Sequence, residues 1–300
     1  MPIQMAKKSR GRIGKKIVPY LFLAPFFTGL GVFWIYPTLH SFYLAFFKQT
    51  GFGQGKFIGF QNFLALLSDT RFARSIVNTT YYAGASVFII LPVALFVASL
   101  LRTPRLPFSQ AFRIGYFLPM VTSGTAVAII FILIFDHQYG ILNFALTLLG
   151  LPRIKWLLDP RFVMPSLVLV GLWKWTGINA LYFYAGLQGI PKEVEEAALV
   201  DGASGWQCFW FVTLPLLRPI LTFTVTLAII GSYQLFAEPY LLTGEGGGPG
   251  DAGLFATVYL YITGFRALRF GYASAIGCVL FGIIFSLSLM QLKAMGAFKD

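Results

Sequence analysis

Long runs of residues without any charge constrain the fold of this chain more than any other sequence feature. The runs comprise 31 residues between Lys16 and Lys48, 27 between Arg74 and Arg102, 22 between Arg113 and Asp136, and 23 between Arg269 and Lys293. A helix needs about 20 apolar residues to cross a hydrocarbon core roughly 30 Å thick. Each of these four runs is therefore long enough to span a membrane.

Two further runs reach a full crossing length, and each contains one charged residue. Lys174 interrupts residues 162–186, and Glu238 interrupts residues 219–243. All these runs are almost continuously apolar and lack the two-residue alternation of a membrane β-barrel, which favours helices. The sequence thus predicts an all-α membrane protein with about six transmembrane helices. The predicted spans are residues 17–40, 76–101, 114–136, 162–186, 219–243 and 270–293.

The first run exceeds one crossing and contains Pro25 and Pro37. We expect the span to end near Pro37 and the chain to continue through residues 41–47 as an interfacial helix. Residues 57–74 and 137–161 mix aromatic and polar groups, which predicts amphipathic segments on the outer side. No linker marks a second domain, so residues 1–16 are predicted to be a basic cytoplasmic tail and residues 17–300 a single transmembrane domain.

The composition excludes a soluble fold. Hydrophobic residues make up 57% of the chain and charged residues 11%, whereas soluble domains carry roughly 25% charged residues. In a membrane protein the net charge of +12 reflects basic cytoplasmic loops rather than nucleic-acid binding. Two cysteines make no disulfide framework, and two histidines leave almost nothing for metal or acid–base chemistry. We therefore predict no metal site and no enzymatic activity in this chain.

Basic residues determine the predicted orientation. Six Lys and Arg residues precede residue 17, and counting the loops on that side gives 13 basic residues there and nine on the other side. Cytoplasmic loops carry the excess of Lys and Arg, and the leading segment usually dominates. Both termini are therefore predicted to be cytoplasmic.

Residues 187–218, between the fourth and fifth predicted spans, carry the most specific signal. Pro191 suits the first position of a helix, and the three glutamates that follow suit its N-terminal turns. Gly202 can adopt a positive φ, and Ser204 and Gln207 have capping-box spacing. The segment predicts a helix–turn–helix on the cytoplasmic face, with small residues that let another protein's backbone approach closely.

This loop resembles the EAA loop of the permease subunits of binding-protein-dependent ABC importers. The residues that carry the resemblance are Glu196-Ala197-Ala198, Gly202 and Val212-Thr213-Leu214-Pro215, with Val212 where the pattern usually has Ile. Residues 20–25, 36–37, 59–63 and 241–249 are similar to recurrent segments of the carbohydrate branch, the maltose-permease-like subunits. The resemblance implies a multi-pass protein of the bacterial inner membrane that forms half of a translocation pathway for a sugar or oligosaccharide.

The resemblance also implies partners. An extracytoplasmic binding protein would deliver the sugar, a second and unlike permease subunit would complete the pathway, and an ATPase dimer would drive it. The sequence contains no Gly-x-x-x-x-Gly-Lys-Ser/Thr loop. We therefore expect ATP and Mg²⁺ on the partner ATPase and no cofactor on this chain.

In that family the EAA loop docks into the ATPase and transmits its closure to the spans. The resemblance implies a coupling surface that comprises Glu196, Ala197, Ala198, Asp201, Gly202, Ala203, Trp206, Phe209 and Pro215. The alternative is that the helix–turn–helix only packs under the bundle.

Polar groups within two predicted spans indicate a substrate path. Lys174 lies roughly 18 Å from the outer end of its span, too deep for its side chain to reach the interface, so it should face the bundle interior or a wet cavity. Aromatic rings beside hydrogen-bonding groups suit a sugar. The predicted path residues are Lys174, Trp175, Ile178, Asn179, Tyr182, Ser232, Tyr233, Gln234 and Glu238, and the resemblance adds Leu235.

Two alternatives remain open for these residues. Polar groups in spans also hold helices together, so they need not contact a substrate. An ion pair between Lys174 and Glu238 is possible, although at 1.5 Å per residue their depths differ by about 10 Å. A buried Lys174 would suit an acidic sugar or a phosphate ester.

Two other functional classes compete with an importer subunit. A stand-alone secondary transporter or channel predicts inverted repeats and several intramembrane carboxylates, but the predicted spans hold one such carboxylate and no evident repeat. An intramembrane enzyme acting on lipid-linked substrates would need nucleophiles, paired carboxylates or metal ligands. The sequence favours the importer subunit.

Overall fold

The computed structural model describes residues 10–51, 53–102, 115 and 118–296. Five basic residues used for the predicted orientation, Lys7, Lys8, Arg105, Arg113 and Lys299, lie outside the described residues, as do residues 1–9 of the predicted tail. The rest of that tail belongs to the first helix, which begins at Arg10.

Almost all the regular structure is helical, which confirms the predicted all-α class. The α-helices are α1 (Arg10–Leu30), α2 (Tyr36–Leu44), α3 (Gln61–Leu67), α4 (Thr70–Ala85), α5 (Leu91–Leu101), α7 (Gly124–Ile134), α8 (Ile141–Leu148), α9 (Pro160–Gln188), α10 (Lys192–Val200), α11 (Gly205–Cys208), α12 (Leu214–Leu216), α13 (Arg218–Gln234), α14 (Ala237–Thr243), α15 (Ala256–Tyr261) and α16 (Phe270–Ala294). π-helical turns occur at Gly31–Ile35, Ser86–Ile90, Phe209–Thr213 and Ile262–Arg266, and a 3₁₀ turn at Pro249–Asp251. Strands β1 (Phe47–Lys48) and β2 (Lys56–Phe57) pair antiparallel.

Three helices in the described part of the chain are long and apolar enough to cross a membrane. They are Pro19–Leu44, Thr70–Leu101 and Phe270–Ala294. The helices Gly205–Leu216 and Arg218–Gln234 pass the same test together, although they meet at an angle of 70°. α9 has 29 residues, enough for about 43 Å of helix, while α7 has 11. The number of six crossings stays a prediction.

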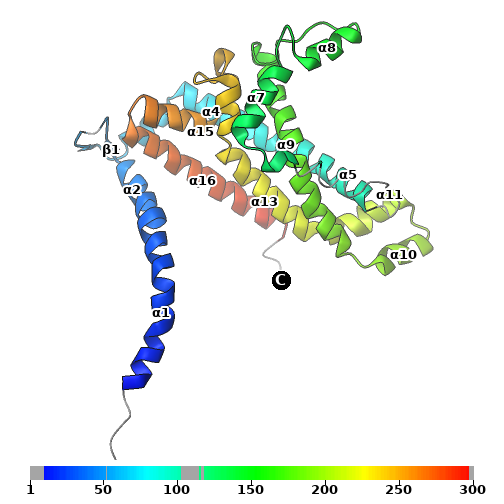
Figure 1. Cartoon of the computed structure of the whole chain (residues 1–300), viewed down its shortest axis with the longest axis horizontal. Helices are drawn as coiled ribbons and strands as arrows, with labels where there is room; N and C mark the ends of the chain where they lie inside the picture. The colour runs from blue at the N-terminus through cyan, green and yellow to red at the C-terminus, as the bar shows by residue number, and fades with distance from the viewer. Residues whose placement is uncertain (1–9, 52, 103–114, 116–117, 297–300) are drawn as a thin grey trace, which may run out of the picture.

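The first helical segment runs unbroken from α1 through α2 and projects away from the bundle (Figure 1). The chain is helical beyond Pro37, as expected, but this part continues the same helix and ends at Leu44 rather than at residue 47; its place at the membrane interface stays a prediction. None of the most apolar part of this segment is buried within the chain.

A π-helical turn explains how this helix and two others continue through a proline. The proline ring clashes with the carbonyl four residues earlier in a regular α-helix. In each of the three turns, the residue before the proline donates its N–H to the carbonyl five residues back, and this wider turn makes room for the ring. The pairs of π turn and proline are Gly31–Ile35 with Pro37, Ser86–Ile90 with Pro92, and Phe209–Thr213 with Pro215.

Two predicted spans are interrupted. In residues 114–136, Ser123 accepts a hydrogen bond from the backbone N–H of Ala126 (3.2 Å) and so caps α7, which begins inside the predicted span. In residues 219–243, α13 ends at Gln234, Leu235 is extended (φ −66°, ψ 122°), and α14 starts at Ala237. The fifth predicted span is thus two helices rather than one.

Asp69 marks the true start of the second long helix. Its Oδ1 accepts hydrogen bonds from the backbone N–H groups of Arg71 and Phe72 (3.0 Å each), and its Oδ2 accepts from the hydroxyls of Tyr259 (2.6 Å) and Tyr272 (2.7 Å). Burial raises the pKa of Asp69, but these hydrogen bonds outweigh burial and hold the pKa below its usual range. The predicted amphipathic segment 57–74 runs from the end of β2 through α3 to the first turn of α4.

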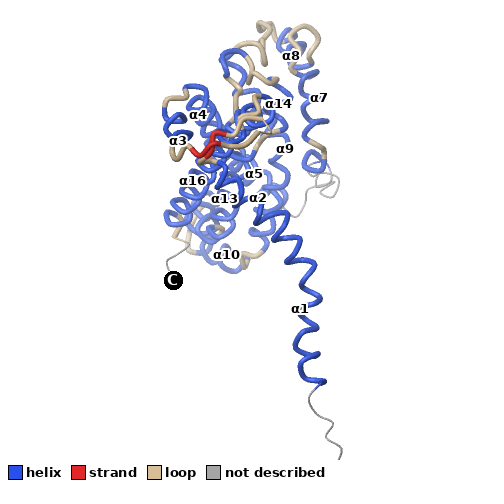
Figure 2. Tube along the Cα trace, turned by 90° about the vertical axis from the view of Figure 1, so that its left-hand side faces the viewer, coloured by secondary structure: helices blue, strands red, loops and turns tan. Residues whose placement is uncertain are grey.

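The core lies where α4, α9, α15 and α16 meet. Tyr82, Val163, Phe255 and Ile276 are buried there. A second cluster joins α5 to α9, where Ala94, Ala98 and Ala180 let the two helices approach closely around Phe183. The beginning of α1, helix α10 and the C-terminal end of α16 all lie toward one end of the molecule, and α8 lies at the other (Figures 1 and 2).

Candidate functional site

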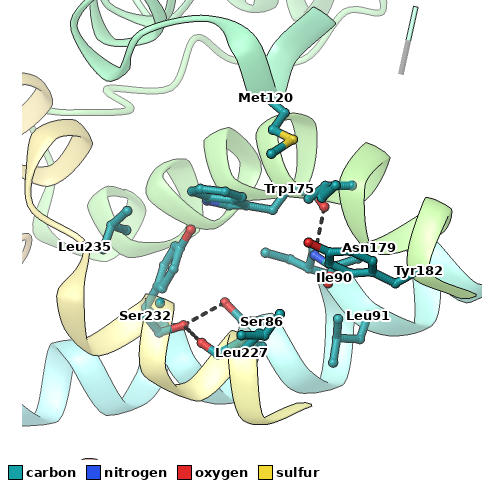
Figure 3. Close-up of a pocket in the computed structure, with 14 residues that line it drawn as sticks. Ser86, Ile90, Leu91, Met120, Trp175, Asn179, Tyr182, Leu227, Ser232 and Leu235 are labelled. Atoms are coloured by element: carbon teal, nitrogen blue, oxygen red, sulfur yellow. Dashed lines mark hydrogen bonds between the residues drawn. The ribbon is translucent and has the colours of Figure 1, made fainter. Parts of the chain in front are cut away.

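A cavity of about 160 Å³ lies between α9, α13 and the junction of α4 with α5 (Figure 3). Met120 lies above it and the indole of Trp175 forms part of its wall. No charged residue lines it among the residues that the structure describes. The lining residues are Tyr82, Ser86, Ile90, Leu91, Met120, Trp175, Ile178, Asn179, Tyr182, Leu227, Ala228, Gly231, Ser232 and Leu235.

Helix α9 contributes four of the predicted path residues to this cavity. Ile178, Asn179 and Tyr182 lie three, four and seven residues after Trp175, which places all four on one helix face. Asn179 Nδ2 donates a hydrogen bond to the carbonyl of Trp175 (2.8 Å), which leaves the amide oxygen as an acceptor. This face therefore combines a flat aromatic ring with a hydrogen-bonding group, as a sugar requires.

Helix α13 forms the opposite wall and contributes Ser232 and Leu235 from the predicted set. The Ser232 hydroxyl donates to the carbonyl of Ala228 (2.6 Å) and lies 3.2 Å from the hydroxyl of Ser86 (Figure 3). These contacts fix both hydroxyls at the cavity wall. Two of its neighbours on α13 lie elsewhere, because Tyr233 is buried against Thr80 (O···O 2.7 Å) and Gln234 is exposed.

Lys174 and Glu238 do not line the cavity but form a buried ion pair with each other. The estimated difference in depth made this pair doubtful, and that estimate was wrong. It assumed a continuous helix to Glu238, whereas the chain breaks after Gln234 and α14 returns the carboxylate to Lys174. Lys174 Nζ also lies 4.9 Å from the ring centroid of Trp175. The charges therefore compensate each other behind the aromatic wall.

Eight lining residues were not predicted, namely Tyr82, Ser86, Ile90, Leu91, Met120, Leu227, Ala228 and Gly231. Most are apolar residues with no chemistry that distinguishes them from core positions. Ser86 is the exception, since a lone hydroxyl in an otherwise apolar run of the second span was a usable signal.

The segment 187–218 forms the predicted helix–turn–helix from α10 and α11. Pro191 lies one position earlier than expected, as the N-cap of α10. Gly202 has φ +91° at the turn. Ser204 and Gln207 form a reciprocal capping box with N···O distances of 2.8 and 3.3 Å. Local chemistry therefore shapes this hairpin as the sequence predicts.

Most of the predicted coupling residues lie at the surface of this hairpin. Glu196, Ala197, Asp201, Gly202, Trp206 and Pro215 are exposed, and Ala198, Ala203 and Phe209 are partly buried. Apolar side chains are exposed around them, with Val200 at 87%, Trp206 at 71% and Phe211 at 77%. An apolar surface of this kind marks an interaction site.

Glu195, next to the predicted Glu196, is turned inward and was missed. Its Oε1 accepts hydrogen bonds from Arg102 Nη1 (2.7 Å) and from the hydroxyl of Thr213 (2.8 Å). Burial raises the pKa of Glu195, but the hydrogen bonds from Arg102 and Thr213 outweigh burial and leave the pKa below its usual range. The carboxylate therefore stays charged at neutral pH.

Residues 90–295 match the family described as the binding-protein-dependent transport system inner membrane component. The chain belongs to this family. The matched region includes the cavity-lining parts of α5, α9 and α13 and the whole helix–turn–helix. The match confirms the permease family that residues 196–215 predicted.

Individual relatives are similar over nearly the whole permease. It is 37% identical to the arabinooligosaccharides transport system permease protein AraP of Bacillus subtilis, over 99% of this chain and 96% of that protein. It is 35% identical to the lactose transport system permease protein LacF of Rhizobium radiobacter, over 97% and 98%. A chain of the bacterial alginate ABC transporter, solved with an alginate pentasaccharide-bound periplasmic protein, shares the fold with a TM-score of 0.83 at 22% identity, covering 98% of this chain and 99% of that chain.

Proposed function

We propose that this permease forms half of the translocation pathway of an ATP-driven importer for a neutral sugar or oligosaccharide. The observation that carries the proposal is that one chain holds both an aromatic, polar cavity in its bundle and an exposed helix–turn–helix at one end. A cavity alone would also suit a stand-alone transporter. Such a transporter has no use for an exposed apolar hairpin.

A neutral rather than an acidic substrate follows from the charges around the cavity. The cation that would suit an acidic sugar, Lys174, is paired with Glu238 and does not line the cavity. Placing a carboxylate against an uncharged wall within the membrane is unfavourable. AraP and LacF, whose names specify arabinooligosaccharides and lactose, support a neutral carbohydrate here.

The partners proposed are an ABC ATPase dimer that binds ATP and Mg²⁺, a solute-binding protein and a second, unlike permease subunit. The exposed coupling residues, led by Glu196 and Trp206, support the ATPase site. The projecting helix α1–α2 is proposed to pack against the second permease subunit. Its aromatic side chains Phe22, Phe33 and Trp34 are 72–82% exposed in the single chain. A heterodimer would cover these rings and complete the cavity.

Both termini and the helix–turn–helix are proposed to be cytoplasmic. The beginning of α1, the end of α16 and the helix–turn–helix lie toward the same end of the molecule (Figures 1 and 2), and six basic residues precede residue 17, as expected for a cytoplasmic segment.

The proposal is tested by solubilising the tagged permease from its native membrane and identifying the proteins that co-purify. An ATPase and a second permease are expected, and uptake of a neutral oligosaccharide by vesicles with the purified complex should require ATP and the binding protein. Gly202→Asp should reduce ATPase association. Gly150→Asp, which places the same residue at another exposed glycine with positive φ (+73°), is the matched control. Transport by the isolated chain without nucleotide would refute the proposal.

A further inference from the structure

One carboxylate connects α10 both to helix α5 of the bundle and to the π turn Phe209–Thr213, which continues the second arm of the helix–turn–helix. Glu195 belongs to the first turn of α10. Arg102, which donates to it, is the C-cap residue of α5. Thr213, the second donor, is buried at the end of the π turn that leads through α12 into α13. A single oxygen atom thus holds three segments together.

Packing around this junction is loose. α10 packs against α11 and the π turn Phe209–Thr213, and its direct link to α5 is the ion pair of Glu195 with Arg102. A cavity of about 260 Å³ lies beside the junction, lined by residues that include Ser99, Leu187 and Cys208. The ion pair with Arg102 is therefore a main contact that places α10 against α5.

Helix α5, which Glu195 contacts through Arg102, and helix α13, which follows the hairpin, are also walls of the cavity. Leu91 of α5 and four residues of α13, ending with Ser232, line that cavity. α9, the remaining wall, continues into α10 through residues 189–191. A displacement of the helix–turn–helix therefore reaches α9 and α13 through the backbone, but it reaches α5 through the Glu195 carboxylate.

We propose that Glu195 is a positioning residue that makes α5 follow the movement of the helix–turn–helix, with Thr213 holding the carboxylate in place. This inference rests on the proposed function, because it presupposes an ATPase that moves the hairpin. Glu196, its exposed neighbour, contacts the partner, and Glu195 carries the displacement inward. Without the hydrogen bonds to Glu195, the ATPase stays bound to the helix–turn–helix, but its movement displaces the cavity wall less.

The test compares Glu195→Gln with Glu193→Gln in the complete transporter reconstituted in vesicles. Glu193 lies on the same helix and is exposed, so its variant is the matched control. We expect Glu195→Gln to retain the ATPase and the basal hydrolysis rate, and to transport about tenfold less sugar per ATP hydrolysed, since one charge-assisted hydrogen bond of this kind changes an equilibrium by about that factor. Glu193→Gln should keep the wild-type ratio.

A charge exchange separates positioning from general damage. Arg102→Glu combined with Glu195→Arg restores the ion pair and should recover most of the transport per ATP. A wild-type ratio in Glu195→Gln overturns the inference. If that variant does not assemble, the test uses Thr213→Val, which removes one of the two hydrogen bonds to Glu195. A lowered ratio of sugar transported per ATP hydrolysed supports the inference, and an unchanged ratio overturns it. Failure of the wild-type chain to bind any ATPase would instead refute the proposed function.

Discussion

Removing the charge of Glu238 alone should destabilise the permease far more than removing both charges of its ion pair. The side chains of Lys174 and Glu238 are only 10% and 6% exposed. Glu238→Gln leaves Lys174 as a buried cation without its counter-ion, which lowers stability by about 3–5 kcal/mol. Lys174→Met combined with Glu238→Leu removes both charges and their desolvation, and such replacements are neutral or stabilising.

The measurement is unfolding of the purified permease in detergent, followed by far-ultraviolet circular dichroism. The double variant should unfold close to the wild type, and Glu238→Gln well below both. Glu245→Gln, which breaks the exposed pair of Glu245 with Arg266, is the control and should unfold almost as the wild type does. Equal loss in the single and double variants would refute the reasoning, because lost packing rather than an uncompensated charge would then explain both.

The same variant tests the selectivity argument. In Glu238→Gln the ammonium of Lys174 stays beside Trp175, 4.9 Å from the ring centroid, without a competing carboxylate. The variant should therefore gain binding of acidic over neutral oligosaccharides, measured as competition for uptake in vesicles. An unchanged preference would show that Lys174 does not act on the cavity.

Three further predictions follow from other contacts. Asp69→Asn keeps the cap of α4 but leaves two tyrosine hydroxyls without their charged acceptor. The free energy of unfolding should therefore fall by about 2 kcal/mol in the same unfolding assay. No change would show that the hydroxyls find other partners. Gly186→Ala should lower stability by about 1–3 kcal/mol, because its Cβ would lie 2.6 Å from Ile220 Cγ1 and 2.8 Å from Leu217 Cδ1. An unfolding midpoint equal to that of the wild type would show that α9 and α13 can move apart without cost. The pKa of Glu195 is below its usual value of 4.5. Its ion pair with Arg102 is therefore present above that pH and is lost as the pH falls through the lowered pKa. Transport per ATP should be constant from about pH 8 to about pH 6, and a decline within that range would contradict the role assigned to Glu195.

Local chemistry made the helix–turn–helix predictable. A glycine at positive φ and a Ser–Gln capping box act over a few residues, so their consequences are visible in the sequence. The cavity face of α9 was predictable for a similar reason, because Trp175, Ile178, Asn179 and Tyr182 share one face of any regular helix.

Contacts between distant segments explain what was missed. Glu195 and Glu196 are adjacent and chemically identical, and about 100° of helix rotation separates them. Arg102 lies 93 residues away from Glu195, and it decides which of the two turns inward. The break after Gln234 was missed for another reason, because the proline that indicates it lies downstream. Pro239 follows Leu235 by four residues, and a proline ring clashes with the carbonyl four residues earlier in a regular helix.

Pro37 and Pro92 show how a helix in this chain continues through a proline. A π turn makes room for the ring of Pro37, and the helix continues to Leu44. The π turn that accommodates Pro92 is Ser86–Ile90, and both of its end residues line the cavity. Because a proline ring clashes with the carbonyl four residues earlier in a regular α-helix, Pro92 favours the wider turn that places a hydroxyl and an aliphatic side chain on the cavity wall.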